Sequence, residues 1–333
     1  MTEKNHIEPG YNSDKFWNYH PPLPLKFAPY FDRPVNIKAI VGYWLKTWNP
    51  RGTQFLFLLI AFMVWLFFTP SLERTATFSF DWIFEIWLRD MILILTIAGG
   101  LHLYLHTFKC QGTELKYDKR ELEKNSRRFH FKNQNWDNMF WTLTTGVGCW
   151  VFWESLLLWA FANGYATLIS FEGNPVWFVV LLAIIPLWSY SFFDFQHRIL
   201  HRPWLYKHVH SWHHKNGNTG PWSGLAMHPL EQFILMSDTL LFFLISAHPV
   251  HVIYSLIFHG LGAPTSHTGY HKVTLGKFTL LNVGDFYHQL HHRFFDTNYG
   301  TLDTPGDLIF DRFHNGTLEG NKRMMEMRKR QAS

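Results

Sequence analysis

The chain has 333 residues and a formal net charge of +5, and aromatic residues make up 18% of it. Charged residues account for only 17%, against roughly 25% in an ordinary soluble domain. The composition therefore argues against a soluble globular protein. It also argues against a nucleic-acid-binding protein, because the basic residues lie beside apolar segments and no helix-turn-helix, zinc-finger or RNA-recognition pattern is present.

Residues 1–50 are polar, and prolines from Pro9 to Pro34 interrupt any long helix. They lack the basic-then-apolar pattern of a cleaved signal peptide. We predict that they form a polar N-terminal arm and that residues 51–333 form a membrane domain.

Five apolar runs follow the arm, and a helix needs about 20 apolar residues to cross the hydrocarbon core. The last run is interrupted by His248-Pro249-Val250-His251, which is compatible with one kinked span or with a hairpin of two short ones. We predict an all-α, polytopic membrane bundle of about four to six membrane segments. The runs are Phe55–Thr69, Ile83–Leu105, Met139–Ala162, Val176–Phe193 and Ile234–Gly262.

The distribution of Lys and Arg between the connections predicts the orientation. The 107–135 connection is rich in Lys and Arg, whereas the 163–175 connection has none. Since basic loops stay in the cytoplasm, the arm, the 107–135 connection and everything beyond the fourth run should face the cytoplasm. A multi-pass protein of this kind would lie in the plasma membrane of a bacterium or in the endoplasmic reticulum of a eukaryote.

Ten histidines between 197 and 292 form four clusters whose spacings of three and four residues place imidazoles on one face of a helix. Neutral imidazole is the commonest protein metal ligand, and ten exceed the four ligands of a tetrahedral zinc site. We therefore predict a cytoplasmic helical cap that holds two metal ions. The predicted ligands are His197, His201, His210, His213, His214, His267, His271, His288, His291 and His292.

A site dominated by nitrogen with an open face suits iron, and two irons can activate O2 to attack an unactivated C–H bond. Soluble di-iron carboxylate proteins use Glu and Glu-x-x-His ligands. No Glu lies inside any of the four clusters, so the sequence disfavours that soluble class.

The motifs HRILH at 197–201, HSWHH at 210–214 and HQLHH at 288–292 resemble the three histidine boxes of the fatty acid hydroxylase / sterol desaturase superfamily of membrane di-iron oxygenases. HTGYH at 267–271 resembles its extra histidine pair. NYGTLDTPGDLIFDRF is similar to the family's tail, so the resemblance covers about 190–315. It implies a cytoplasmic cap with two irons. It also implies O2-dependent hydroxylation or desaturation of a lipid, with electrons from a separate cytochrome b5, ferredoxin or reductase.

Two departures from the family bear on the partners and the substrate. The chain has no His-Pro-Gly-Gly haem motif, so no fused cytochrome b5 domain is expected. The segment WSGLAMHPLEQF differs from the versions in particular sterol oxidases. Sterol-like and fatty acyl lipids are the preferred substrates, while sphingolipids and carotenoids stay open.

Further residues are candidates for holding the ligands. Six polar residues near the boxes could accept a hydrogen bond from a ligand's second nitrogen, or could cap helices and pair with Arg instead. They are Asp194, Asp285, Asn298, Asp296, Asp303 and Asp311. His228 could orient a ligand or line the substrate's route. The role of Tyr270 is left open. Interfacial, turn or packing roles are expected for His102, His106, His208, Trp212, His248, His251, His259 and Tyr287.

The sequence thus predicts a membrane di-iron monooxygenase or desaturase that acts on a lipid. Two other classes stay open: a non-enzymatic membrane protein that binds or transports metal, and an inactive scaffold that retains the fold.

Overall fold

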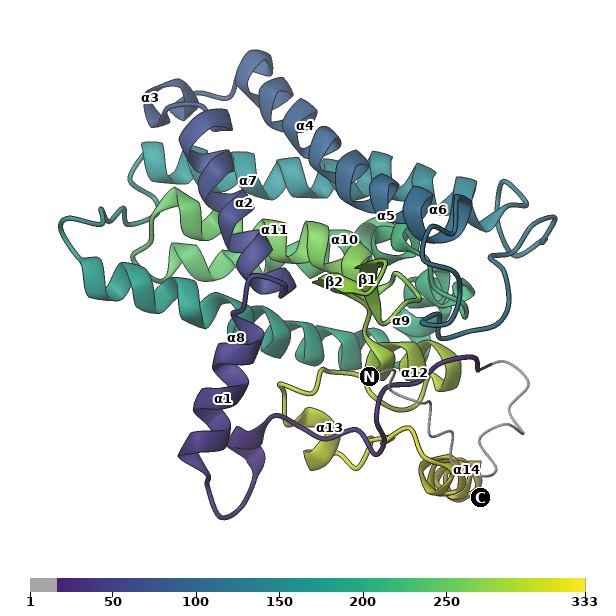
Figure 1. Ribbon diagram of the computed structural model, residues 1–333. Coiled ribbons are helices and arrows are strands. Elements are labelled where there is room, and N and C mark those ends of the chain that lie inside the picture. Colours follow the sequence, from purple (N-terminus) through teal and green to yellow (C-terminus); the bar gives the residue numbers. More distant parts are fainter. Residues whose placement is uncertain (1–16, 333) are drawn as a thin grey trace.

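The computed structural model describes residues 17–332, and the first sixteen residues of the predicted arm lie outside the described residues. The described chain is mostly helical, with one antiparallel two-stranded sheet, β1 (Lys272–Leu275) and β2 (Phe278–Asn282). The predicted all-α class is confirmed (Figure 1). The helices are α1 (Ile37–Thr47), α2 (Thr53–Phe68), α3 (Leu72–Thr75), α4 (Phe80–Ile94), α5 (Gly100–His102), α6 (Gln134–Trp141), α7 (Val147–Ala162), α8 (Pro175–Leu200), α9 (Pro203–His208), α10 (Pro229–Leu235), α11 (Pro249–Ser266), α12 (Phe286–Phe294), α13 (Gly306–Ile309) and α14 (Leu318–Ala332).

Three helical segments are long and apolar enough to cross a membrane: Phe80–Thr107, Gln134–Ala162 and Pro175–Leu200. They coincide with the second, third and fourth predicted runs. The first run forms α2, whose 16 residues give a shorter apolar helix of about 24 Å. Three long helices and one short one thus account for the first four runs.

The fifth run is a hairpin rather than one kinked span. A 3₁₀ segment, Met236–Phe243, leads into a turn, and α11 then returns through the bundle with Pro249 in its first turn. Proline is tolerated there because the first N–H groups of a helix have no partner within it. Nearly all of α11 is buried, so it forms the centre of the bundle rather than a surface for lipid.

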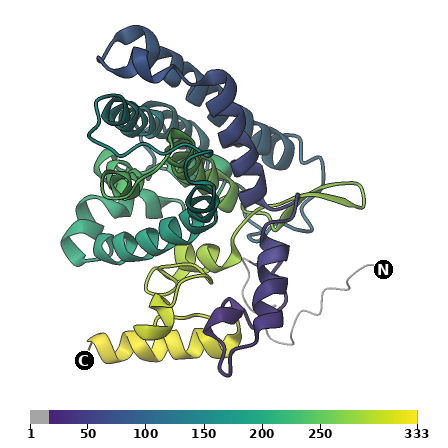
Figure 2. The ribbon, with the colours of Figure 1, turned by 90° about the vertical axis from the view of Figure 1, so that its left-hand side faces the viewer.

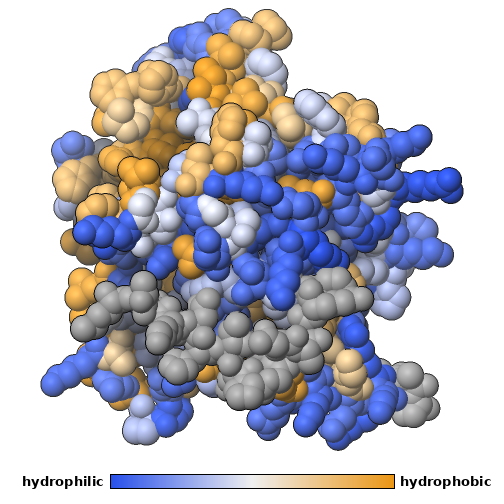
Figure 3. Space-filling model, turned by 45° about the vertical axis from the view of Figure 1, so that its right-hand side comes forward, coloured by the Kyte–Doolittle hydropathy of each residue, from blue (hydrophilic) through white to orange (hydrophobic). Residues whose placement is uncertain are grey.

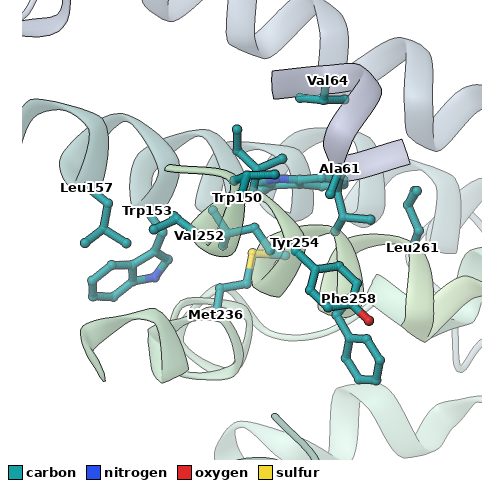
Figure 4. Packing of buried hydrophobic residues seen from close by; sticks show 14 of the residues in the cluster. Ala61, Val64, Trp150, Trp153, Leu157, Met236, Val252, Tyr254, Phe258 and Leu261 are labelled. Atoms are coloured by element: carbon teal, nitrogen blue, oxygen red, sulfur yellow. The ribbon is translucent and has the colours of Figure 1, made fainter. Parts of the chain in front are cut away.

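The core is built around α11, which packs against α2, α7 and α8. Figure 4 shows Trp150 and Trp153 of α7 and Tyr254 and Phe258 of α11 among the side chains of this one cluster. A side chain at Gly260 would place its Cβ 2.2 Å from the Trp150 ring, so only glycine allows the two helices to approach this closely.

Buried charges join α4 to α7. The Arg89 guanidinium lies 2.8 Å from Asp90 Oδ1 and 2.6 Å from Glu154 Oε2, and both carboxylates are fully buried. Arg89 also donates to the backbone carbonyl of Phe68, at the end of α2. One guanidinium therefore connects three helices in the apolar part of the molecule.

The chain after α11 packs against the N-terminal arm from residue 17 onward. Trp17, Tyr117, Phe286 and Leu290 form a separate hydrophobic cluster, which ties the arm to α12. Figures 1 and 2 show α12, α13 and α14 gathered on one side of the bundle, beside the arm. In Figure 3, hydrophobic surface concentrates toward the upper left of the molecule, whereas hydrophilic surface covers most of its right side.

Candidate metal centre

Two groups of histidines meet where α8, α11 and α12 end or begin, and together they contain nine of the ten predicted ligands. Within each group the ligand nitrogens lie within 4.8 Å of one another. The first group consists of His197, His201, His210, His214 and His291; the second consists of His213, His267, His288 and His292.

Each HxxHH motif contributes to both groups. His210 and His214 belong to the first group, while His213 between them belongs to the second. On α12 the assignment is reversed, because His288 and His292 share one face with a spacing of four and His291 points to the first group. The two segments therefore lie between the two groups and supply ligands to both.

The nitrogen geometry of the site fits metal ions. Neighbouring Nε2 atoms are separated by 2.9 Å, between His197 and His210, up to 3.3 Å, between His213 and His267. Ligands held about 2.0–2.1 Å from one metal ion lie roughly 3.0–3.4 Å apart. Each group has the spacing that a shared metal ion imposes.

The other ring nitrogens explain why a cation is needed. Nδ1 of His197 donates to the carbonyl of Tyr299 at 2.6 Å, Nδ1 of His291 to that of Thr297 at 2.7 Å, and Nδ1 of His267 to that of Ala263 at 2.8 Å. A carbonyl can only accept, so each Nδ1 carries the proton and each Nε2 is left with a lone pair. Lone pairs facing one another inside the protein repel unless a cation lies between them.

Burial keeps the clustered histidines neutral. It lowers the pKa of His213, His214, His288 and His292 well below the ordinary value, and neighbouring imidazoles add to the effect. Burial likewise lowers the pKa of His291 to about 3 and that of His267 to about 4. Neutral imidazole is the form that binds metal, so the centre is ready for metal at neutral pH.

Glu231 of α10 contacts the histidine groups, although no local sequence pattern pointed to it. Its Oε1 accepts a hydrogen bond from Nδ1 of His210 at 2.6 Å, and both side chains are buried. The acidic residues expected from the sequence lie near the first and last boxes, whereas Glu231 lies 17 residues beyond the second box. Only folding brings α10 over His210.

Glu231 should therefore set the orientation of a ligand, and substituting it tests this. Glu231→Ala removes the acceptor, and we expect metal affinity to fall about 10–100-fold. Glu231→Gln keeps an acceptor oxygen and should lose much less. Metal titration of the two variants against a competing chelator measures the difference, and equal affinities for both variants would contradict this role.

The predicted holding residues have other partners in the structure. Asp194 accepts from Arg198, Asp285 caps the start of α12, and Asn298 bonds to the backbones of Tyr287 and His314. In these contacts they bind Arg198 or backbone groups rather than the imidazole rings. Arg198 also binds Asp307, which accepts from the backbone N–H of Gly300 and thereby holds the loop that presents the Tyr299 carbonyl.

His271 is the predicted ligand that the structure does not bring to either group. The expected helix across HTGYH is wrong: α11 ends at Ser266, and Gly269 adopts a φ of +73° before β1 begins. The backbone therefore turns, and His271 lies beside Tyr117, whose hydroxyl is 3.3 Å from Nδ1. The HSWHH box is also not α-helical but a 3₁₀ helix.

The other singled-out histidines have structural contacts. His228 caps α10 by accepting from the N–H of Leu230, and it is not among the residues that line the cavity described below. His248 caps α11, and His106 bonds to the Thr268 carbonyl. Tyr270, which was left open, donates to the Leu105 carbonyl.

A cavity of about 350 Å³ opens onto both groups of histidines. His197 and His210 of the first group line it, as do His213, His267 and His288 of the second. Most of its remaining wall is apolar, with Phe57, Phe193, Leu200, Leu235 and Phe258 among the lining residues. Tyr43 and the acidic residues Glu231, Asp285 and Asp303 also line it. A hydrophobic molecule in this cavity would lie against both metal positions.

A comparison with known protein families agrees with this geometry. The fatty acid hydroxylase family model matches residues 177–312, which contain all nine clustered histidines and Glu231. The residues before 177, with α1, α2, α4 and α7, lie outside the match.

Three curated relatives that match this chain are named as monooxygenases or as an oxidase. Over 141 residues, 41% of this chain and 51% of the relative, the chain is 32% identical to methylsterol monooxygenase 2-2 of Arabidopsis thaliana. It is 28% identical to sphinganine C4-monooxygenase 2 of the same plant over 40% of this chain and 51% of the relative. It is 29% identical to lathosterol oxidase of Rattus norvegicus over 47% and 54%.

The chain thus spans about half the length of the curated relatives it matches. No solved structure matches it significantly.

Proposed function

We propose that this chain is a membrane di-iron oxygenase that hydroxylates or desaturates a lipid. The observation that carries the proposal is the pair of buried histidine groups opening onto one largely apolar cavity. The match of residues 177–312 to the fatty acid hydroxylase family model supports it, as do the monooxygenases and the oxidase among the relatives. Nine closely spaced imidazoles in two closed groups do not form the path through the bilayer that a metal transporter needs.

The chemistry needs O2 and two electrons from outside the chain. Hydroxylation consumes one C–H bond, O2, two electrons and two protons, and yields an alcohol and water; desaturation consumes two C–H bonds and yields an alkene and two waters. Bound irons would supply the activation of O2. The electron donor would be a separate cytochrome b5, ferredoxin or reductase.

The chain's own residues hold and screen the site. Carbonyls of the 297–299 loop and the Glu231 carboxylate fix the imidazole rings, so that the ligand nitrogens stay in place through each cycle. The apolar wall around Phe193 and Leu200 excludes water and sets which C–H bond lies beside the metals. Placement of that bond decides between hydroxylation and desaturation.

We further propose that the histidine centre, the N-terminal arm and the 107–135 connection face the cytoplasm. The excess of Lys and Arg in that connection supports this orientation, and the separate electron donor would then reach the centre from the cytoplasm.

Comparing cellular lipids under 18O2 tests the function. With the wild-type chain, we expect one lipid class to gain 18O or to lose two hydrogens. His213→Ala should abolish the change because it removes a ligand of the second group. His208→Ala, an exposed histidine outside both groups, should preserve it. If no lipid gains oxygen or loses hydrogen with the wild type, the proposal fails for the lipids sampled.

A further inference from the structure

A buried polar cluster lies in the otherwise apolar part of the cavity wall. Asp238 Oδ2 accepts hydrogen bonds from Ser189 of α8 at 2.8 Å and from Ser255 of α11 at 2.9 Å, and Nε2 of His259 lies 2.9 Å from the same oxygen. Ser189 and His259 line the cavity, while Asp238 and Ser255 stand behind them. Asp238 Oδ1 and His259 Nε2 are both buried and form no hydrogen bond. Polar groups at such depth in a membrane protein are costly and generally serve a function.

Two helices place this cluster at the same distance from the metal centre. Ser189 precedes the ligand His197 by eight residues on α8, and His259 precedes the ligand His267 by eight residues along α11. With a rise of 1.5 Å per residue, the cluster lies about 12 Å along each helix from the histidine groups. One cavity wall therefore has metal ligands at one level and a polar pair at another.

The hydrogen-bond directions specify what this polar pair can bind. The Ser189 proton is used on Asp238, so its oxygen offers only lone pairs to the cavity. His259 lines the cavity beside Ser189, and its Nε2 is buried without a hydrogen-bond partner. A matching group must donate a hydrogen bond. A carboxylate cannot donate, and the Asp238 carboxylate behind the wall repels it.

We propose that Ser189 and His259, backed by Asp238, form a binding site for the hydroxyl group of a neutral lipid alcohol. Phe57, Leu235 and Phe258 supply the apolar surface for the hydrocarbon. Building on the proposed function, the oxidised carbon is then several bonds away from this hydroxyl, because the histidine groups lie about 12 Å along the helices. The site thus selects the class of substrate and the region of the molecule that is oxidised.

Ligand-dependent thermal stabilisation of the purified, iron-loaded full chain in detergent micelles tests the site. The probes are 1-octadecanol, 1-methoxyoctadecane, which has a similar length but cannot donate a hydrogen bond, and octadecanoate. We expect the alcohol to raise the unfolding midpoint most, because only it pairs with the lone pairs of Ser189. Ser189→Ala should weaken binding of the alcohol on the order of fivefold and leave binding of the ether unchanged.

Two serine variants serve as controls. Ser191→Ala, on the same helix, removes a hydroxyl that bonds only to the Leu187 carbonyl and should change nothing. Ser255→Ala removes an Asp238 bond outside the cavity and should keep the preference for the alcohol. Equal stabilisation of the wild type by alcohol and ether would overturn the proposal, as would an equal loss with Ser189→Ala and Ser255→Ala.

The binding measurement involves no turnover, so the two proposals fail separately. A chain that prefers the alcohol but oxidises no lipid keeps the hydroxyl site and loses the oxygenase function. A chain that oxidises lipids but binds alcohol and ether equally loses only the hydroxyl site.

Discussion

Replacing His292 with alanine should reduce the metal bound per chain from about two ions to about one. His292 belongs to the group of four, and its Nε2 lies 3.1 Å from those of His267 and His288. Three ligands remain in that group, whereas the five of the first group are untouched. Oxidation of lipid should then fall to background, because the proposed reaction would need both irons. Iron analysis of the purified variant measures the loss.

His271→Ala is the matched control, because His271 comes from the same cluster motif but lies outside both groups. We expect it to retain about two irons per chain. Loss of an iron from His271→Ala would show that this residue is a ligand after all. A His292→Ala variant that keeps both ions would contradict the division into two groups.

Arg89→Ala should be the most damaging change in the membrane bundle. It removes the guanidinium that pairs with two fully buried carboxylates, Asp90 and Glu154, and leaves both in an apolar environment without it. Breaking a buried ion pair from one side costs about 3–5 kcal/mol. We expect a correspondingly lower free energy of unfolding, measured by denaturant titration in micelles.

Arg74→Ala provides the comparison, since Arg74 also bridges two carboxylates, Asp81 and Glu85, but on the exposed surface. Solvent screens such pairs, so this variant should unfold almost like the wild type. Equal destabilisation by the two substitutions would mean that burial of the Arg89 cluster has no energetic consequence.

Some predictions from the sequence succeeded because they depend on local pattern. The length of each apolar run gave the positions of α2, α4, α7 and α8, since a helix satisfies its own backbone hydrogen bonds and needs no distant partner to do so. The helix that histidine spacing predicted across HTGYH was wrong, because a turn interrupts that segment. At HTGYH the chain leaves α11 after Ser266, and the positive φ of Gly269 turns His271 away from the centre.

Other features had no local signal. The contact between Glu231 and His210 joins α10 to a 3₁₀ segment, and the cluster of Ser189, Asp238 and His259 draws on three separate elements. In the sequence, His259 reads as a turn or interface residue; in the structure it faces the cavity beside Asp238.

The sequence by itself determined that this is a helical membrane protein with a histidine-rich site suited to two metals, because hydropathy and residue chemistry are properties of short segments. Tertiary structure decided which nine histidines converge, how the two HxxHH motifs divide between the groups, and what lines the cavity. These depend on where helices end and which faces meet. Packing across residues far apart in the chain fixes both.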